Sequence, residues 1–286
     1  AHREQARPTF EAWLAKSQRQ DLDAWIPSAG LQLLAPLNDG GDEIAYSING
    51  AKATSPRNAT VEWREGKTGS QAAYLNQGAA LEVAGAGDFE GDQPFSAAAW
   101  VKLPGNDASG SIMARMDDGK DYRGWDLWSE GRRVGAHIIN KWPENALKVV
   151  TSEPLPADEW VHVAVAYDGS RKASGIKVYV NGELKPTNVT ADSLTETTRT
   201  TVPLKVGQRH TGSPLSGVTV EDVRIYARAL ADSEATSLAN AAMFAALIAA
   251  PVEKRDAANV ESLYGWWLTN VDADGKRLAA ERDALT

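Results

Sequence analysis

Aromatic and polar side chains gather between residues 122 and 143 in a combination suited to binding sugars. Sugar rings expose apolar C–H faces between their hydroxyl groups, so a sugar site needs flat aromatic rings beside hydrogen-bonding side chains. This stretch supplies both. The predicted ligand-binding residues are Arg123, Trp125, His137, Asn140 and Trp142.

The spacing of the tryptophans divides this set. Trp125 and Trp128 are three residues apart, so on one strand their side chains point to opposite faces, and at least one belongs to the core. Trp142 precedes a proline in an expected loop, which makes it the best candidate for a ring stacked on a ligand. Packing of the whole set inside the protein remains an equal alternative to ligand binding.

Three acids alternate in a second segment, at Asp88, Glu90 and Asp92. On a strand they would share one face, and a retaining glycosidase places two carboxyl groups about 5 Å apart. The glycines and the proline around them favour a loop. We therefore predict a solvated or cation-binding loop, with a glycoside hydrolase as the minor alternative.

The composition excludes several other functions. The 286 residues include no cysteine, which removes disulfides, thiolate-bound metals and cysteine nucleophiles. The formal net charge of −8 argues against a nucleic-acid partner, because such proteins need a basic face. The most apolar run, 239–252, is too short to span a membrane. The expectation is a protein that is not an enzyme, binds no nucleic acid and has no membrane span.

Short strands separated by turn residues fill the chain from about 30 to 230, a pattern typical of a β-sandwich. The segment 160–167 is apolar on both faces and predicts a central strand, and Asn181-Gly182 predicts a type I′ hairpin. The predicted strands are 31–37, 60–64, 72–75, 80–84, 95–103, 111–115, 125–128, 133–140, 147–151, 160–167, 176–180, 204–206 and 218–226.

Helical periodicity marks both ends of the chain. It covers residues 1 to about 26, where Pro27 ends it, and returns in two helices over 233–247 and 256–268. The predicted division is an N-terminal helical flank (1–29), a sandwich domain (30–232) and a C-terminal helical region (233–286). Residues 270–281 follow the acid and glycine spacing of an EF-hand, with an ordinary helix–loop–helix as the alternative.

Four motifs between residues 78 and 230 resemble the laminin G-like, concanavalin A-like jelly roll. This resemblance implies a mainly β fold, a concanavalin A-like β-sandwich jelly roll with flanking N- and C-terminal helices. The motifs are GAALEVAGAGDFEGDQPFSAAAWVKLP from residue 78, EWVHVAVAYDGSRKASGIKVYVNGEL from residue 159, VPLKVGQRH from residue 202 and SGVTVEDVRIYARALADSEATSLA from residue 216.

Two further segments, YRGWDLWSEG and HIINKWPENALKV, are similar to a narrower group. These are laminin G-like modules inside large bacterial exported proteins that also carry a cytochrome c-type haem domain. The similarity implies an exported location, periplasmic or at the cell surface, and neighbouring domains in a larger protein.

The laminin G-like resemblance also implies calcium, because many such domains bind it with acids of an early loop and oxygens near the last strand. The corresponding residues here are Asp39, Asp42 and Asp222. A plain turn with a buried structural aspartate remains the alternative. The predicted function is a non-catalytic module that binds carbohydrate or another surface ligand. The alternative is a structural domain that orients its neighbours.

Overall fold

The computed structural model of this protein describes residues 2–18, 20–23, 25–106 and 108–283. The chain forms two compact units. One contains Pro27–Ala239, and the other combines Ala1–Ile26 with Asn240–Thr286. The two helical ends of the sequence therefore belong to one unit, and the sandwich is inserted between them.

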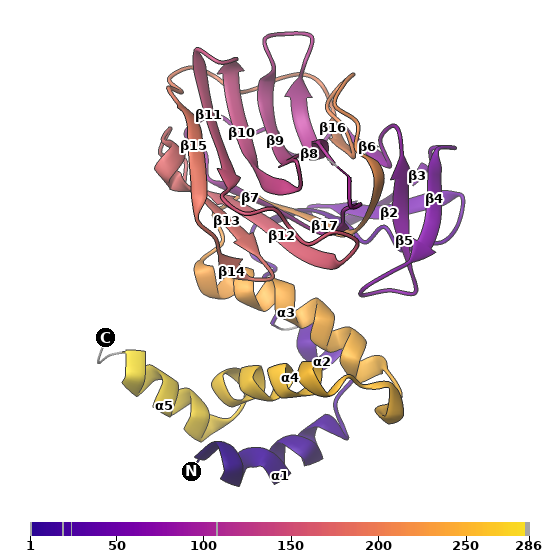
Figure 1. The fold of residues 1–286 in the computed structure, drawn as a ribbon, viewed down its shortest axis with the longest axis vertical. Coiled ribbons are helices and arrows are strands. Elements are labelled where there is room, and N and C mark those ends of the chain that lie inside the picture. The colour runs from indigo at the N-terminus through magenta and orange to yellow at the C-terminus, as the bar shows by residue number, and fades with distance from the viewer. Residues whose placement is uncertain (1, 19, 24, 107, 284–286) are drawn as a thin grey trace. The chain divides into compact units, whose positions relative to one another are not determined.

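The larger sheet of the sandwich unit has ten strands among the described residues (Figure 1). These strands are β1 (Leu31–Ala35), β2 (Glu43–Ile48), β3 (Ala51–Pro56), β4 (Val61–Glu65), β5 (Gln71–Asn76), β7 (Phe95–Lys102), β12 (Trp160–Tyr167), β13 (Ile176–Val180), β14 (Glu183–Leu184) and β17 (Ser216–Tyr226). Their order is β14-β13-β12-β7-β17-β1-β2-β3, with β5 also paired to β17 and β4 paired to β5.

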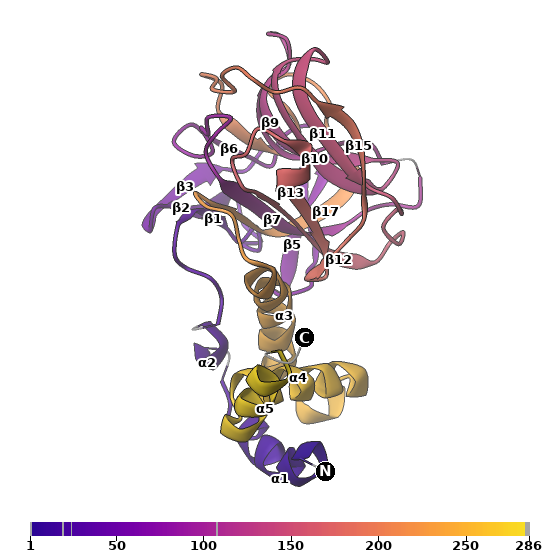
Figure 2. The ribbon, with the colours of Figure 1, turned by 90° about the vertical axis from the view of Figure 1, so that its left-hand side faces the viewer.

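The second sheet has seven strands in the same described part of the chain and faces the first (Figures 1 and 2). These are β6 (Leu81–Val83), β8 (Gly110–Asp117), β9 (Arg123–Glu130), β10 (Arg133–Lys141), β11 (Asn145–Thr151), β15 (Thr187–Asp192) and β16 (Leu204–Val206). Their order is β15-β11-β10-β9-β8-β16-β6, and their ladders are antiparallel. The predicted mainly β sandwich is confirmed.

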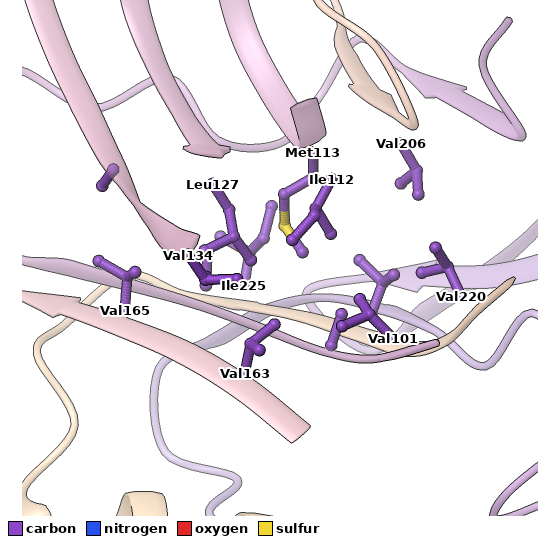
Figure 3. Close-up of a cluster of buried hydrophobic side chains, with 14 of the residues drawn as sticks. Val101, Ile112, Met113, Leu127, Val134, Val163, Val165, Val206, Val220 and Ile225 are labelled. Atoms are coloured by element: carbon purple, nitrogen blue, oxygen red, sulfur yellow. The ribbon is translucent and has the colours of Figure 1, made fainter. Parts of the chain in front are cut away.

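Apolar side chains from both sheets meet between them and form the core. Figure 3 shows this contact, with Val101, Val163 and Ile225 on one side and Leu127 and Val134 on the other. Each fully buried aliphatic side chain stabilises the fold by roughly 1.5–3 kcal/mol relative to exposure. The strand alternation that buries these residues turns the residues between them outward.

Two local predictions about the sandwich are confirmed. β12 lies between β13 and β7, so the doubly apolar segment is a central strand. Asn181 and Gly182 both have positive φ, 52° and 80°, as a type I′ turn requires.

Four strands, β2, β3, β14 and β15, have no counterpart among the predicted ones. β3 and β15 each lie at one edge of a sheet. Their side chains are mostly exposed, so they carry no apolar alternation, and backbone pairing to one neighbour holds them in place. A sequence pattern based on burial cannot detect such strands.

The helices form the second unit, except that α3 begins in the sandwich unit and ends in this one. Phe10 packs on Tyr264 and Trp267, with ring centroids 4.7 and 5.7 Å apart, so the N- and C-terminal helices share one apolar core. The helices are α1 (His2–Leu14), α2 (Gln20–Asp23), α3 (Asp232–Ala249), α4 (Ala257–Asn270) and α5 (Ala273–Asp283); Ala173–Gly175 and Val252–Lys254 form 3₁₀ turns.

The EF-hand hypothesis for residues 270–281 is wrong. α5 begins at Ala273, so most of the twelve residues that would form the loop are helical. The Asp272 carboxylate accepts a hydrogen bond from the Gly275 N–H at 2.7 Å and lies 2.7 Å from His2 Nε2. The helix–loop–helix alternative is the observed structure.

Candidate functional site

A pocket of about 220 Å³ lies on the face of the seven-stranded sheet that points away from the core. Its floor and walls come from β9, β10 and β11 and from the loops that follow β8, β10 and β16. The lining residues are Tyr122, Trp128, His137, Ile139, Trp142, Lys148 and Arg209.

Strand alternation brings the floor residues together. β9 and β10 pair so that Asp126 lies opposite His137. Leu127 and Ile138 point into the core, so Asp126, Trp128 and His137 point to the outer face.

A buried ionic group forms the base of the pocket. Asp126 has no exposed surface, and its Oδ1 lies 2.8 Å from Nδ1 of His137 while its Oδ2 accepts from Nε of Arg209 at 2.8 Å. Burial alone would raise the pKa of Asp126, but the charges and hydrogen bonds of Arg209 and His137 outweigh it and hold that pKa at about 2. An ionised carboxylate only accepts, so Nδ1 of His137 is the protonated nitrogen.

This arrangement fixes the orientation of the imidazole. Among the described residues, none hydrogen-bonds the opposite nitrogen, Nε2 of His137, which remains available to a ligand. The ring lies between two indoles in edge-to-face contact. Its centroid is 5.4 Å from that of Trp128 and 5.4 Å from that of Trp142, at interplanar angles of 77° and 82°.

Two cations lie against the aromatic walls. The Arg209 guanidinium is 4.4 Å from the ring centroid of Trp128 and 5.3 Å from that of Tyr122, within the range of cation–π attraction. Lys148 Nζ is 5.8 Å from the ring of Trp142 and donates to Glu130 at 2.5 Å. The hydrogen bond from Lys148 lowers the pKa of Glu130, which keeps this carboxylate ionised.

Three loops at the rim are tied to one another. The Asp118 carboxylate accepts from the Thr211 N–H and hydroxyl at 2.9 and 3.0 Å, and the Trp142 N–H donates to the Asp121 carbonyl at 3.0 Å. Asp121 and Tyr122 have φ of +57° and +61°, a left-handed conformation that is uncommon for an aromatic residue. Such conformations persist where the surroundings enforce them, and they concentrate at binding and active sites.

The structure brings together two of the five predicted ligand-binding residues, His137 and Trp142. Trp125 is 2% exposed and lies in the core, where it packs on Phe95 and donates to the Gly87 carbonyl at 2.7 Å. The inference that Trp125 and Trp128 face opposite sides is confirmed, with Trp128 on the pocket side.

The other two predicted residues lie outside the pocket lining. Asn140 is buried and donates from Nδ2 to the Thr197 carbonyl at 2.7 Å, so it anchors a loop. Arg123, at the start of β9, is half-buried and does not line the pocket.

Sequence reasoning missed Lys148 and Arg209. Lys148 lies opposite His137 across the β10–β11 ladder, so the correct strand register would have identified it. Arg209 lies in a loop after β16, far from the other residues in sequence, and no local pattern points to it.

The three acids predicted to bind calcium do not converge on one point. Asp42 is exposed and paired with Arg57 at 3.0 Å, and Asp222 is buried against Arg224 at 2.9 Å. Asp39 accepts a backbone N–H at 3.3 Å. Within the described part of the chain, no group of three or more acidic or histidine side chains could hold a metal ion. Calcium stays a prediction without geometric support.

The alternating acids lie in a loop between β6 and β7, as their glycine and proline neighbours predicted. Each acid has a partner of its own, which does not favour a pair of catalytic carboxyl groups. Asp88 faces Arg115 at 3.8 Å, Glu90 accepts from the Thr197 hydroxyl at 2.7 Å, and Asp92 faces Arg171 at 3.2 Å.

A family model described as the concanavalin A-like lectin/glucanases superfamily matches residues 75–236, more than half of the chain. No curated protein sequence matches significantly. In the described residues, no helix has the length and apolar character needed to span a membrane.

The similar solved structures are distant in sequence. The binding domain of Paraclostridial Mosquitocidal Protein 1 has a TM-score of 0.57 at 16% identity, over 74% of this chain and 52% of that one. The botulinum neurotoxin type G receptor-binding domain has a TM-score of 0.51 at 16% identity, over 74% of this chain and 51% of that one. Domain 4 of AbnA, an arabinanase from Geobacillus stearothermophilus, has a TM-score of 0.47 at 20% identity, over 74% of this chain and 100% of that one. This chain thus spans about half the length of the first two.

Proposed function

Because this chain belongs to the concanavalin A-like lectin/glucanases superfamily, we propose that it is a non-catalytic module that binds carbohydrate in the pocket described above. One observation carries the proposal: His137 lies between Trp128 and Trp142 in an outward-facing pocket, with its Nε2 available for a hydrogen bond. Indole rings accept the apolar face of a sugar, and the imidazole can bond one of its hydroxyl groups.

The size of the pocket supports a small ligand. Sites for drug-sized molecules have volumes of roughly 300–1,000 Å³, and this one has about 220 Å³. It therefore suits one sugar ring, or the end of a chain, better than a long oligosaccharide.

The chemistry of the pocket favours binding over hydrolysis. A glycosidase needs a carboxylic acid that can release a proton and a second carboxylate at a fixed distance. The carboxylate at the base, Asp126, has a pKa of about 2 and uses both oxygens for His137 and Arg209. It orients the imidazole and is not a proton donor at neutral pH.

Two proteins with this fold are themselves binding domains, one of a mosquitocidal protein and one of a neurotoxin, which supports a binding role here. The exported location and the neighbouring domains belong to the same proposal, because folds of this family are typical of extracellular domains. A structural role in orienting those domains is the competing proposal.

A glycan array tests the function. We expect the wild-type chain to bind at least one glycan, and Trp142→Ala to lose most of that binding because the stacking ring is removed. Trp63→Ala is the matched control, since Trp63 is also half-buried but lies on β4, outside the pocket. Thermal unfolding of each variant confirms that it is folded.

Two results would reject the proposal. If the wild type binds no glycan with or without added calcium, the structural role replaces the binding role. If Trp142→Ala and Trp63→Ala lose binding equally, the site lies elsewhere.

A further inference from the structure

The hydrogen-bonding side chains around the pocket are mostly donors. Arg209, Lys148 and Trp142 can only donate, whereas the N–H of Trp128 is buried. The acceptors are the Tyr122 hydroxyl and, in the neutral imidazole, Nε2 of His137. Of the described residues that line the pocket, none carries a carboxylate or an amide.

Two carboxylates that contact the lining residues are already engaged. Asp126 lies beneath the floor, fully buried, with Oδ1 bonded to His137 and Oδ2 bonded to Arg209. Glu130 is outside the lining and accepts from Lys148. Neither is free to accept a hydroxyl proton from a ligand.

Both cations keep unused N–H groups. An ammonium has three N–H donors, and Lys148 uses one for Glu130. Arg209 directs Nε and Nη2 to Asp126, and its Nη1 forms no hydrogen bond with a described residue. These spare donors belong to positively charged groups, and hydrogen bonds from charged donors to anionic oxygens are roughly twice as strong as neutral ones.

A neutral sugar fits such a pocket poorly. Each hydroxyl group both donates and accepts, so a site for neutral sugars supplies donors and acceptors together. An anionic oxygen group only accepts, and it can take several N–H groups at once. Resting on the proposed function, we infer that this pocket selects a sugar ring that carries an anionic oxygen group, a carboxylate or a sulfate.

The test compares matched glycans on the full chain. Titration calorimetry uses a uronic acid oligosaccharide and its carboxyl-reduced counterpart, then a sulfated oligosaccharide and its desulfated counterpart. For at least one pair we expect the anionic member to bind about tenfold or more tightly at low salt. The advantage should shrink as ionic strength rises, because salt screens exposed charges.

A pair of lysine variants assigns the preference to this pocket. Lys148→Met removes the ammonium and keeps the apolar stem, so the anionic advantage should fall by several-fold. Lys205→Met is the control. Lys205 lies on β16 of the same sheet. Its side chain has the same exposed fraction as that of Lys148, 14%, and its Nζ is paired with the Glu82 carboxylate at 3.2 Å. It lies outside this pocket, so its loss should leave the preference unchanged.

Each outcome has a meaning. A preference confined to the uronate pair or to the sulfate pair supports the inference and identifies the anionic group. Equal affinity for charged and neutral members overturns the inference and leaves carbohydrate binding intact, whereas no binding to any glycan overturns both. Equal losses in Lys148→Met and Lys205→Met overturn the assignment to this pocket.

Discussion

Acid should destabilise the sandwich unit through His162, on the central strand β12. This side chain is 1% exposed, and among the described residues neither of its ring nitrogens has a hydrogen-bond partner. Burial lowers its pKa to about 4, with the Arg224 charge acting in the same direction and the Asp222 charge opposing both. The native protein therefore holds this imidazole in its neutral form over most of the pH range.

The pKa shift sets the size and the pH window of the effect. In the unfolded chain a histidine titrates near pH 6.5, so acid protonates the unfolded state first and favours it. The contribution of His162 is fully present above pH 6.5 and is lost as the pH falls to about 4. The difference between a pKa of 6.5 in the unfolded chain and about 4 in the native protein corresponds to roughly 3 kcal/mol, of which about 2.5 kcal/mol is lost by pH 4.5.

Urea unfolding, followed by tryptophan fluorescence, measures this loss at pH 7, 6, 5 and 4.5. The comparison is with His162→Gln, which is similar in size and does not titrate, so the difference between the two proteins cancels the other ionisable groups. Hydrogen exchange of β12 amides identifies the transition of the sandwich unit. If the difference in free energy of unfolding changes by less than about 1 kcal/mol over this range, the reasoning is refuted.

Three other substitutions should destabilise the sandwich unit, each measured by urea unfolding against the wild type. Gly135→Ala places a Cβ 1.8 Å from the Val149 carbonyl oxygen, so the two strands must separate and little folded protein is expected. Tyr167→Phe removes the hydroxyl that donates to the Gly91 carbonyl at 2.6 Å and should cost about 1–3 kcal/mol. Asp126→Asn leaves a buried guanidinium without its counter-charge and should cost about 3–5 kcal/mol. Wild-type stability in any of the three would contradict the packing described for that residue.

The sequence predicted the buried strands better than the exposed ones. β12 and β17 carry apolar residues on the core face and so leave a clear pattern. β3 and β15 lie at sheet edges, and their exposed side chains leave almost none. Burial, the physical basis of the pattern, is absent where the prediction failed.

The pocket was predictable only where its residues are neighbours in sequence. His137 and Trp142 come from one strand and the loop after it, so composition alone found them. Trp128 followed from alternation, and Lys148 required the register between two strands. Arg209 enters from a loop about 70 residues further along, and its contact with Asp126 is visible only in the folded chain.

The divided helical unit has a consequence for how this protein must be synthesised. The Tyr264 hydroxyl donates to the carbonyl of Arg3, which lies 261 residues earlier in the chain. At about 5–20 residues per second, a ribosome adds Tyr264 roughly 13–50 s after Arg3. During that time α1 lacks the apolar side chains of α4 against which it packs. Closing a loop of about 200 disordered residues costs about 5 kcal/mol of chain entropy.

A folded sandwich removes that cost, because Leu31 of β1 pairs with Tyr226 of β17 and brings the two ends of the insertion side by side. Packing of the helical unit therefore depends on the folded sandwich, which brings together the two chain segments that form that unit. A substitution that unfolds the sandwich should also release α1 from α4, although no atom of the helical core has changed.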